Sequence, residues 1–195
     1  MKKYLLILLF FSCSEGFSQN SATFKDNRDG KVYKTVTIGT QTWMAENLAY
    51  RIDSGCWAYD DNPANIAKYG YLYSLETAKA ICPKGWHLPS DDEWDKLRTY
   101  LGGEIVAGGT MKSTKGYKNN GNGTNSSGFA GLPGGYRDKN GTYLNNGICG
   151  IWWNATAAGA SSLNWSIVLN NKCSVANDYD IDKKSGLSVR CIKDN

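Results

Sequence analysis

The most constraining feature of this sequence of 195 residues is a single clear helical pattern followed by a long stretch without periodicity. A helix is predicted over 91–101, because Ser90 and Glu93 form a capping box and Gly102-Gly103 follow as a stop signal. Its apolar residues Trp94, Leu97 and Leu101 share one face. From Gly108 through residue 128, Gly, Asn and Ser dominate. The chain is therefore limited to short elements joined by long ordered loops.

The other predicted elements are one shorter helix and a series of strands. Ser74 is the expected N-cap of this helix, which continues over 77–81 and stops at Pro83. Extended patterns occupy 23–26, 31–38, 41–44, 69–73, 130–137, 150–154, 164–169 and 187–192. The first two strands are joined by a turn at 27–30. A calcium loop is not predicted there, because Lys25 stands where such a loop needs its first Asp.

The N-terminus has the pattern of an export signal. Lys2 and Lys3 precede the apolar run Tyr4–Phe11, which is shorter than the roughly 20 residues that span a bilayer. We expect a signal peptide at 1–18, cleaved before Gln19, and a single domain at 19–195. A lipid anchor at Cys13 is the open alternative. The rest of the sequence contains no apolar run of membrane-spanning length.

Charge and histidine content exclude several classes of function. The net charge is only +4, without a basic cluster, so a nucleic-acid partner is not expected. His87 is the one histidine of the sequence, which rules out zinc sites built on two histidines. A triad with one histidine stays formally open, but a structural role for His87 is favoured. We expect no catalytic residue, no metal and no cofactor.

Aromatic and amide side chains concentrate between Ile151 and Tyr179, where we expect any ligand face. Adjacent strand residues point to opposite sides, so one Trp of the pair 152–153 is expected in the core and the other at the surface. The alternative, in which both pack under loops, stays open. The candidate ligand-binding residues are Trp152, Trp153, Asn154, Asn164, Trp165, Asn170, Asn177 and Tyr179. Asn171 belongs to the same Asn-rich connections.

Two further patterns have competing interpretations. Asp178, Asp180 and Asp182 would share one face of a strand and could bind a cation, but a solvated acidic edge is favoured. Cys149 and Cys173 flank a predicted hairpin of 150–154 and 164–169, and a disulfide between them is expected.

Ordered motifs along the chain resemble the major paralogous domain family named from Fibrobacter succinogenes. The matching segments are Asp29-Gly30-Lys31-Val32-Tyr33, Ile38-Gly39, 41–48 (QTWMAENL), 69–73 (YGYLY), 85–94 (GWHLPSDDEW), 132–137 (LPGGYR), Trp152-Trp153 and 186–191 (GLSVRC). They span about 24–193. The helix entry at 88–94 and the run at 186–190 also look like the formylglycine-generating enzyme superfamily.

This resemblance implies an α+β domain with a variant of the C-type lectin fold. Two short helices would flank a small, twisted, mostly antiparallel sheet with long loops. In lectin-like folds the end of the first helix and the last strand lie side by side, which implies a Cys82–Cys191 disulfide. The family often has a partner cysteine near position 66 for a residue like Cys56. Ile66 stands there in this sequence, so Cys56 is expected to be unpaired.

The function expected from these features is that of an exported, non-enzymatic domain that binds a glycan or a protein at the cell surface or outside the cell. Lectin-type calcium binding is not expected, because the Pro-containing ligand triplets of sugar-binding lectins are missing. A divergent enzyme of the formylglycine-generating type is one alternative. It would need a copper-binding or redox-active thiol pair, but Cys173 and Cys191 lie 18 residues apart. A purely structural surface protein is the other.

Overall fold

The computed structural model describes residues 20–159 and 162–195. The predicted signal peptide, its cleavage site and Cys13 lie outside these described residues. Within them, no helix combines the length and the apolar character needed to cross a membrane.

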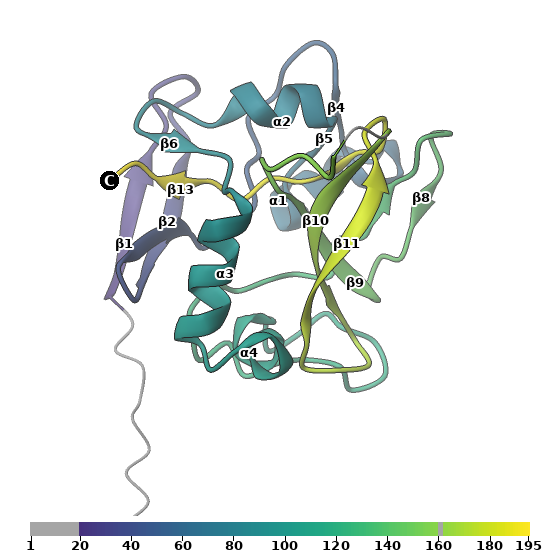
Figure 1. Ribbon diagram of the computed structural model, residues 1–195. Helices are drawn as coiled ribbons and strands as arrows, with labels where there is room; N and C mark the ends of the chain where they lie inside the picture. The colour runs from purple at the N-terminus through teal and green to yellow at the C-terminus, as the bar shows by residue number, and fades with distance from the viewer. Residues whose placement is uncertain (1–19, 160–161) are drawn as a thin grey trace, which may run out of the picture.

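The described residues form an α+β fold with short helices and two main sheets, which lie on opposite sides of the view in Figure 1. The helices are α1 (Ile66–Tyr69), α2 (Leu75–Ile81), α3 (Asp91–Tyr100) and α4 (Glu104–Met111). Two 3-10 turns, Tyr59–Asp61 and Pro63–Asn65, precede α1.

One sheet has five strands and the other six. The five-stranded sheet has the order β1 (Asn20–Lys25), β2 (Val32–Ile38), β3 (Gln41–Met44), β13 (Ile192–Lys193), β6 (Trp86–His87). The six-stranded sheet has the order β11 (Ala176–Asp182), β10 (Leu163–Asn170), β9 (Cys149–Trp153), β12 (Leu187–Ser188), β5 (Leu72–Tyr73), β4 (Cys56–Trp57). β12 and β9 are parallel, and the other pairs are antiparallel. A separate ribbon joins β7 (Tyr136–Arg137) and β8 (Tyr143–Leu144).

Two predictions that depend only on neighbouring residues, the capping box of α3 and the turn of the first hairpin, are confirmed. The capping box of α3 is present: the Ser90 hydroxyl accepts from the Glu93 amide, and a Glu93 carboxylate oxygen accepts from the Ser90 amide at 2.8 Å. The β1–β2 hairpin turns between Lys25 and Val32, as predicted.

The prediction of two helices and one small sheet was wrong in its numbers. The described residues contain four short helices, and their strands divide between two main sheets. α4 lies in a segment too rich in glycine to carry a helical pattern. Packing explains this helix: a Cβ atom on Gly108 would lie 2.6 Å from the carbonyl oxygen of Val175, so only glycine permits the close approach of α4 to the chain before β11.

Two hydrophobic clusters lie on opposite faces of β9 and β10. The first contains Ile151 and Trp153 together with α2 and residues of β2, β3 and β12. The second contains Trp152, Ile167 and Leu169 together with α3 and α4. Because both faces of these strands are covered, every residue of β9 is buried.

Candidate functional site

An open groove with a volume of about 800 Å³ lies between the first hairpin, α1 and the long loop 113–132. Its walls include Ala22 and Thr23 of β1, Thr35 of β2, and Ala67 of α1. Residues 45–47, which follow β3, also line it. The groove therefore draws on segments that are far apart in the sequence.

The α1 wall is fixed by a sharp turn at its end. Gly70 has φ = +72°, and a Cβ atom there would lie 2.5 Å from the Leu48 carbonyl oxygen. The Asn47 side-chain amide donates to the Tyr69 carbonyl at 2.8 Å, and the Tyr71 amide donates to the Leu48 carbonyl at 3.1 Å. These contacts hold α1 against the segment that follows β3.

The opposite wall is an irregular loop closed by its own hydrogen bonds. The Asn125 side-chain oxygen accepts from the Ala130 amide at 2.7 Å, and the Asn125 amide donates to the Lys112 carbonyl at 3.1 Å. The Ser113 amide donates to the Gly131 carbonyl at 2.9 Å. This Gly- and Asn-rich segment is thus an ordered wall, as its sequence pattern indicates.

A fully buried cation lies beside the groove. Arg190 donates to Asn47 Oδ1 through Nε (3.2 Å) and Nη2 (2.8 Å), to the Met44 carbonyl (3.3 Å), and to the Phe129 carbonyl. Its guanidinium also stacks on the Phe129 ring, 4.4 Å from the centroid. Burial lowers the pKa of Arg190 to about 9, so the group stays charged at neutral pH. All of these hydrogen-bond acceptors are uncharged.

The groove itself is rich in lysine. Its charged lining residues are Lys31, Lys34, Lys68, Lys115 and Glu46. One Glu46 carboxylate oxygen accepts from the Lys34 backbone amide at 2.9 Å. Four cationic side chains thus surround the groove with one carboxylate among them.

The predicted ligand face between Ile151 and Tyr179 is mostly inaccessible. Trp152 and Trp153 do point to opposite sides of β9, but both are fully buried, so the expectation that one is exposed was wrong. The Trp152 indole donates to Asn47 Oδ1 at 2.9 Å, and the Trp153 indole donates to the Tyr73 carbonyl at 2.6 Å. The error arose because the sequence does not show that both sheet faces are covered.

Several asparagine side chains of this face are buried or form hydrogen bonds within the protein. Asn154 and Asn164 are fully buried; Asn154 donates to Asp91 at 2.8 Å, and Asn164 donates to the Asn154 carbonyl at 2.8 Å. Asn170 is half-buried and accepts from the Lys172 amide in a local turn. Asn171 is buried, and Asn177 is half-buried.

Two aromatic residues of the face remain accessible, but they do not form one platform. Trp165 is half-buried and Tyr179 is 57% exposed. Tyr179 pairs with Ser166, the neighbour of Trp165 in β10, so the two aromatic side chains point to opposite sides of the sheet.

Two of the three alternating carboxylates of β11, those of Asp178 and Asp182, have separate cationic partners. Asp178 accepts from Arg98 at 2.9 Å, and Asp182 lies 3.8 Å from the Lys139 ammonium. Arg98 also pairs with Asp95. Across 20–159 and 162–195, no three His, Cys, Asp or Glu side chains gather as a metal site would require.

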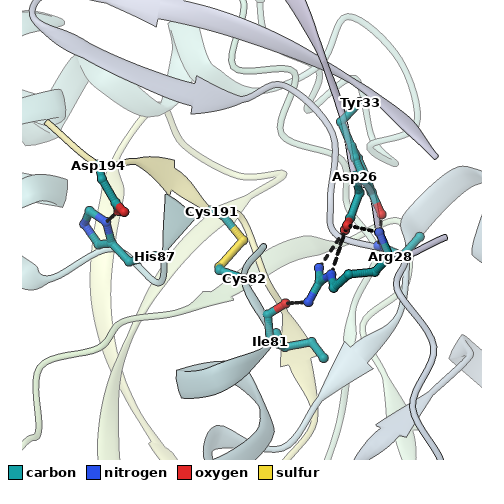
Figure 2. Close-up of a disulfide and its surroundings, with 9 residues drawn as sticks. Asp26, Arg28, Tyr33, Ile81, Cys82, His87, Cys191 and Asp194 are labelled. Carbon is teal, nitrogen blue, oxygen red and sulfur yellow. Dashed lines mark hydrogen bonds and ion pairs between the residues drawn. A yellow bond between two sulfur atoms is a disulfide. The ribbon is translucent and has the colours of Figure 1, made fainter. Parts of the chain in front are cut away.

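The Cys82–Cys191 disulfide is confirmed (Figure 2). It joins the end of α2 to the residue before β13, across a Cα–Cα distance of 5.9 Å and a sequence separation of 109. In Figure 2 it lies between the His87–Asp194 contact and Arg28, which binds Asp26 and donates to the Ile81 carbonyl at 2.7 Å.

The predicted Cys149–Cys173 disulfide is wrong, because both residues are free thiols, as is Cys56. The expected hairpin exists, and Cys149 pairs with Asn170. Cys149 is buried in the first cluster, however, and the turn after Asn170 leads toward α4. There the Lys112 ammonium holds the Cys173 carbonyl at 2.9 Å.

His87 bridges two carboxylates. Its Nδ1 lies 2.6 Å from Asp194, and its Nε2 lies 2.8 Å from Glu93. Burial alone would lower the pKa of His87, but the hydrogen bonds and charges of Asp194 and Glu93 outweigh it and raise the pKa. The side chain therefore links α3 to the end of β13, in line with a structural role.

The groove was missed in the sequence because five separate segments build it. One signal was visible: Arg190 is the one charged residue of the predicted strand 187–192, whose other residues are apolar except for Ser188. A charged residue in such a run indicates a buried cation with dedicated partners. Those partners, however, could not be named from the sequence.

Comparison with protein families gives a match over most of the chain. A family model described as the Fibrobacter succinogenes major domain matches residues 36–193. No curated protein and no solved structure matches the chain.

Proposed function

The chain belongs to the Fibrobacter succinogenes major domain family, and we propose that it is an exported, non-enzymatic domain that binds a glycan or a protein at the cell surface or outside the cell. The groove between the first hairpin, α1 and loop 113–132 is its binding site. The single observation that carries this proposal is the groove itself: a concavity of about 800 Å³ with walls fixed by hydrogen bonds.

A C-type-lectin-like fold is part of the proposal. Its support is the disulfide between α2 and the end of the chain, together with the pairing of β13 with β3, which brings the last strand beside the first ones. Scaffolds of this kind can carry many different sites, so the function is argued from the groove and not from the fold.

A binding role is favoured over the enzyme alternative by the chemistry of the groove. In the described part of the chain, its ionisable lining residues are lysines and Glu46, with no His or Cys. Two of the cysteines that a thiol-dependent enzyme could use, Cys82 and Cys191, are bonded to each other, and none of the free thiols among the described residues lines the groove. Export is supported by that disulfide, since such bonds persist in oxidising compartments.

The role of the groove as the binding site can be tested by placing a large side chain at its edge. Ala67 is exposed on α1 and lines the groove, whereas Ala80 is exposed on α2 and does not. We expect the wild-type protein to bind one or more members of a glycan array or a panel of cell-surface proteins. Ala67→Trp should abolish that binding, and Ala80→Trp should leave it unchanged, with equal melting temperatures.

Two results would count against the proposal. Absence of binding to every arrayed glycan and protein would contradict the function. Unchanged binding by Ala67→Trp would place the binding site elsewhere on the molecule.

A further inference from the structure

We propose that the groove selects an anionic oligosaccharide, whose carboxylate or sulfate groups lie against Lys31, Lys34, Lys68 and Lys115. This inference rests on the proposed function and deepens it by naming the ligand class. It is carried by the groove, the charges around it and the buried Arg190 beside it.

The four lysines are available to a ligand. None of the ion pairs between described residues involves them. Two ammonium groups are positioned by aromatic rings: that of Lys31 lies 5.1 Å from the Tyr33 ring centroid, and that of Lys68 lies 4.6 Å from the Tyr69 centroid. Cations that surround a concavity without carboxylate partners attract a ligand with matching negative charges.

Arg190 adds a positive charge behind the wall of the groove. It contacts Asn47 and the Ala130 carbonyl, and both of these residues line the groove. Its hydrogen-bond acceptors are uncharged and water is excluded, so its field is only weakly screened, and the Glu46 carboxylate in the groove lining offsets part of it. A neutral or cationic ligand would gain nothing from this arrangement.

The remaining lining fits a saccharide. Thr23 and Thr114 offer hydroxyl groups that can both donate to and accept from sugar hydroxyls. Among the described residues that line the groove none is aromatic, so a neutral sugar would find no ring there on which to stack. Charge must therefore supply much of the affinity and the selection.

The decisive experiment compares ligands that differ in charge alone. The probes are an oligogalacturonate of defined length, its fully methyl-esterified form, a sulfated oligosaccharide of similar length, and a polyglutamate peptide. Binding is measured by calorimetry at low and at physiological salt. The protein variants are Lys34→Gln/Lys68→Gln in the groove and Lys84→Gln/Lys172→Gln as a control with the same change of charge on exposed residues outside it.

We expect at least one anionic oligosaccharide to bind, with affinity falling as salt rises. Esterification should abolish uronate binding. The groove variant should bind at least about fivefold more weakly, since two ion pairs are lost, while the control stays within about twofold of wild type. The uronate and sulfate arms identify which anionic group is preferred.

Three outcomes would overturn the inference. Equal binding of the esterified and free oligogalacturonate would show that charge does not select the ligand. Tighter lysine-dependent binding of polyglutamate would assign the groove to acidic peptides. Binding of a neutral arrayed glycan that Ala67→Trp blocks, without binding of any anionic probe, would retain the proposed function and reject the anionic class.

Discussion

Asn47 and Arg190, which are 143 residues apart in the sequence, are joined by two hydrogen bonds of 2.8 and 3.2 Å inside the protein. The same Asn47 oxygen accepts from the Trp152 indole, and the Asn47 amide donates to the Tyr69 carbonyl. One buried amide thus connects the segment after β3, α1, β9 and the chain before β13.

Removing the Asn47 side chain should leave the buried Arg190 guanidinium without two of its hydrogen bonds. We expect Asn47→Ala to lower the free energy of unfolding by about 3 kcal/mol or more, because a buried charge loses its partner. Denaturant unfolding measures the change. Asn27→Ala, in an exposed turn, is the matched control and should stay within about 0.5 kcal/mol of wild type. A similar small effect of Asn47→Ala would refute the connecting role.

The disulfide should be a main source of stability. Replacing Cys82 and Cys191 together by Ser should cost about 4–5 kcal/mol in the chain-entropy model, since the bond joins residues with a sequence separation of 109. Cys56→Ser, which alters a free thiol, should cost much less. Equal unfolding midpoints for the double variant and the wild type would contradict this expectation.

The free thiols should differ in reactivity. Cys149 is 4% exposed, and burial raises its pKa to about 11, so at pH 8 it carries about a hundredfold less thiolate than an ordinary cysteine. Cys56 and Cys173 are half-buried. In the native protein, alkylation followed by peptide mapping should label these two well before Cys149. Detection of a Cys149–Cys173 linkage in the unreduced protein would contradict the structure.

Stability should fall as pH rises through the titration of His87. Its pKa in the folded state is raised, so its contribution is fully present below the unfolded-state pKa of about 6.5 and is lost above the folded-state pKa. The loss should not exceed about 1 kcal/mol, because the imidazole and Asp194 are partly exposed. Unfolding midpoints between pH 5.5 and 9 measure the effect, and His87→Gln should remove it. If the wild-type protein became more stable from pH 5.5 to 9, and this increase were absent in His87→Gln, the pKa of His87 would be lowered in the folded state, contrary to the prediction.

Substitutions at Trp94 and at Tyr179 should differ in their effect on stability, because Trp94 lies in the core and Tyr179 lies at the surface. Trp94 is fully buried, with its ring 4.7 Å from that of Trp43, so Trp94→Ala should cost about 3–5 kcal/mol. Tyr179→Ala should change stability by about 0.5 kcal/mol or less, since that side chain is 57% exposed. Thermal and denaturant unfolding of both variants would reveal any reversal of this order.

The sequence by itself determined the features that depend on neighbouring residues. The capping box at Ser90 and Glu93 set the start of α3, and the turn signal at 27–30 set the first hairpin. The family motifs implied the Cys82–Cys191 bond. Alternation along β9 correctly sent Trp152 and Trp153 to opposite sides.

Only the tertiary structure decided which elements cover the two faces of β9. Both faces of β9 are buried, because α3 and α4 pack on one face and α2 packs on the other, so neither Trp reaches solvent. The turn after Asn170 separates Cys173 from Cys149, and five distant segments enclose the groove beside Arg190. These outcomes depend on long-range packing between elements, and such packing leaves no periodic signal in any one segment.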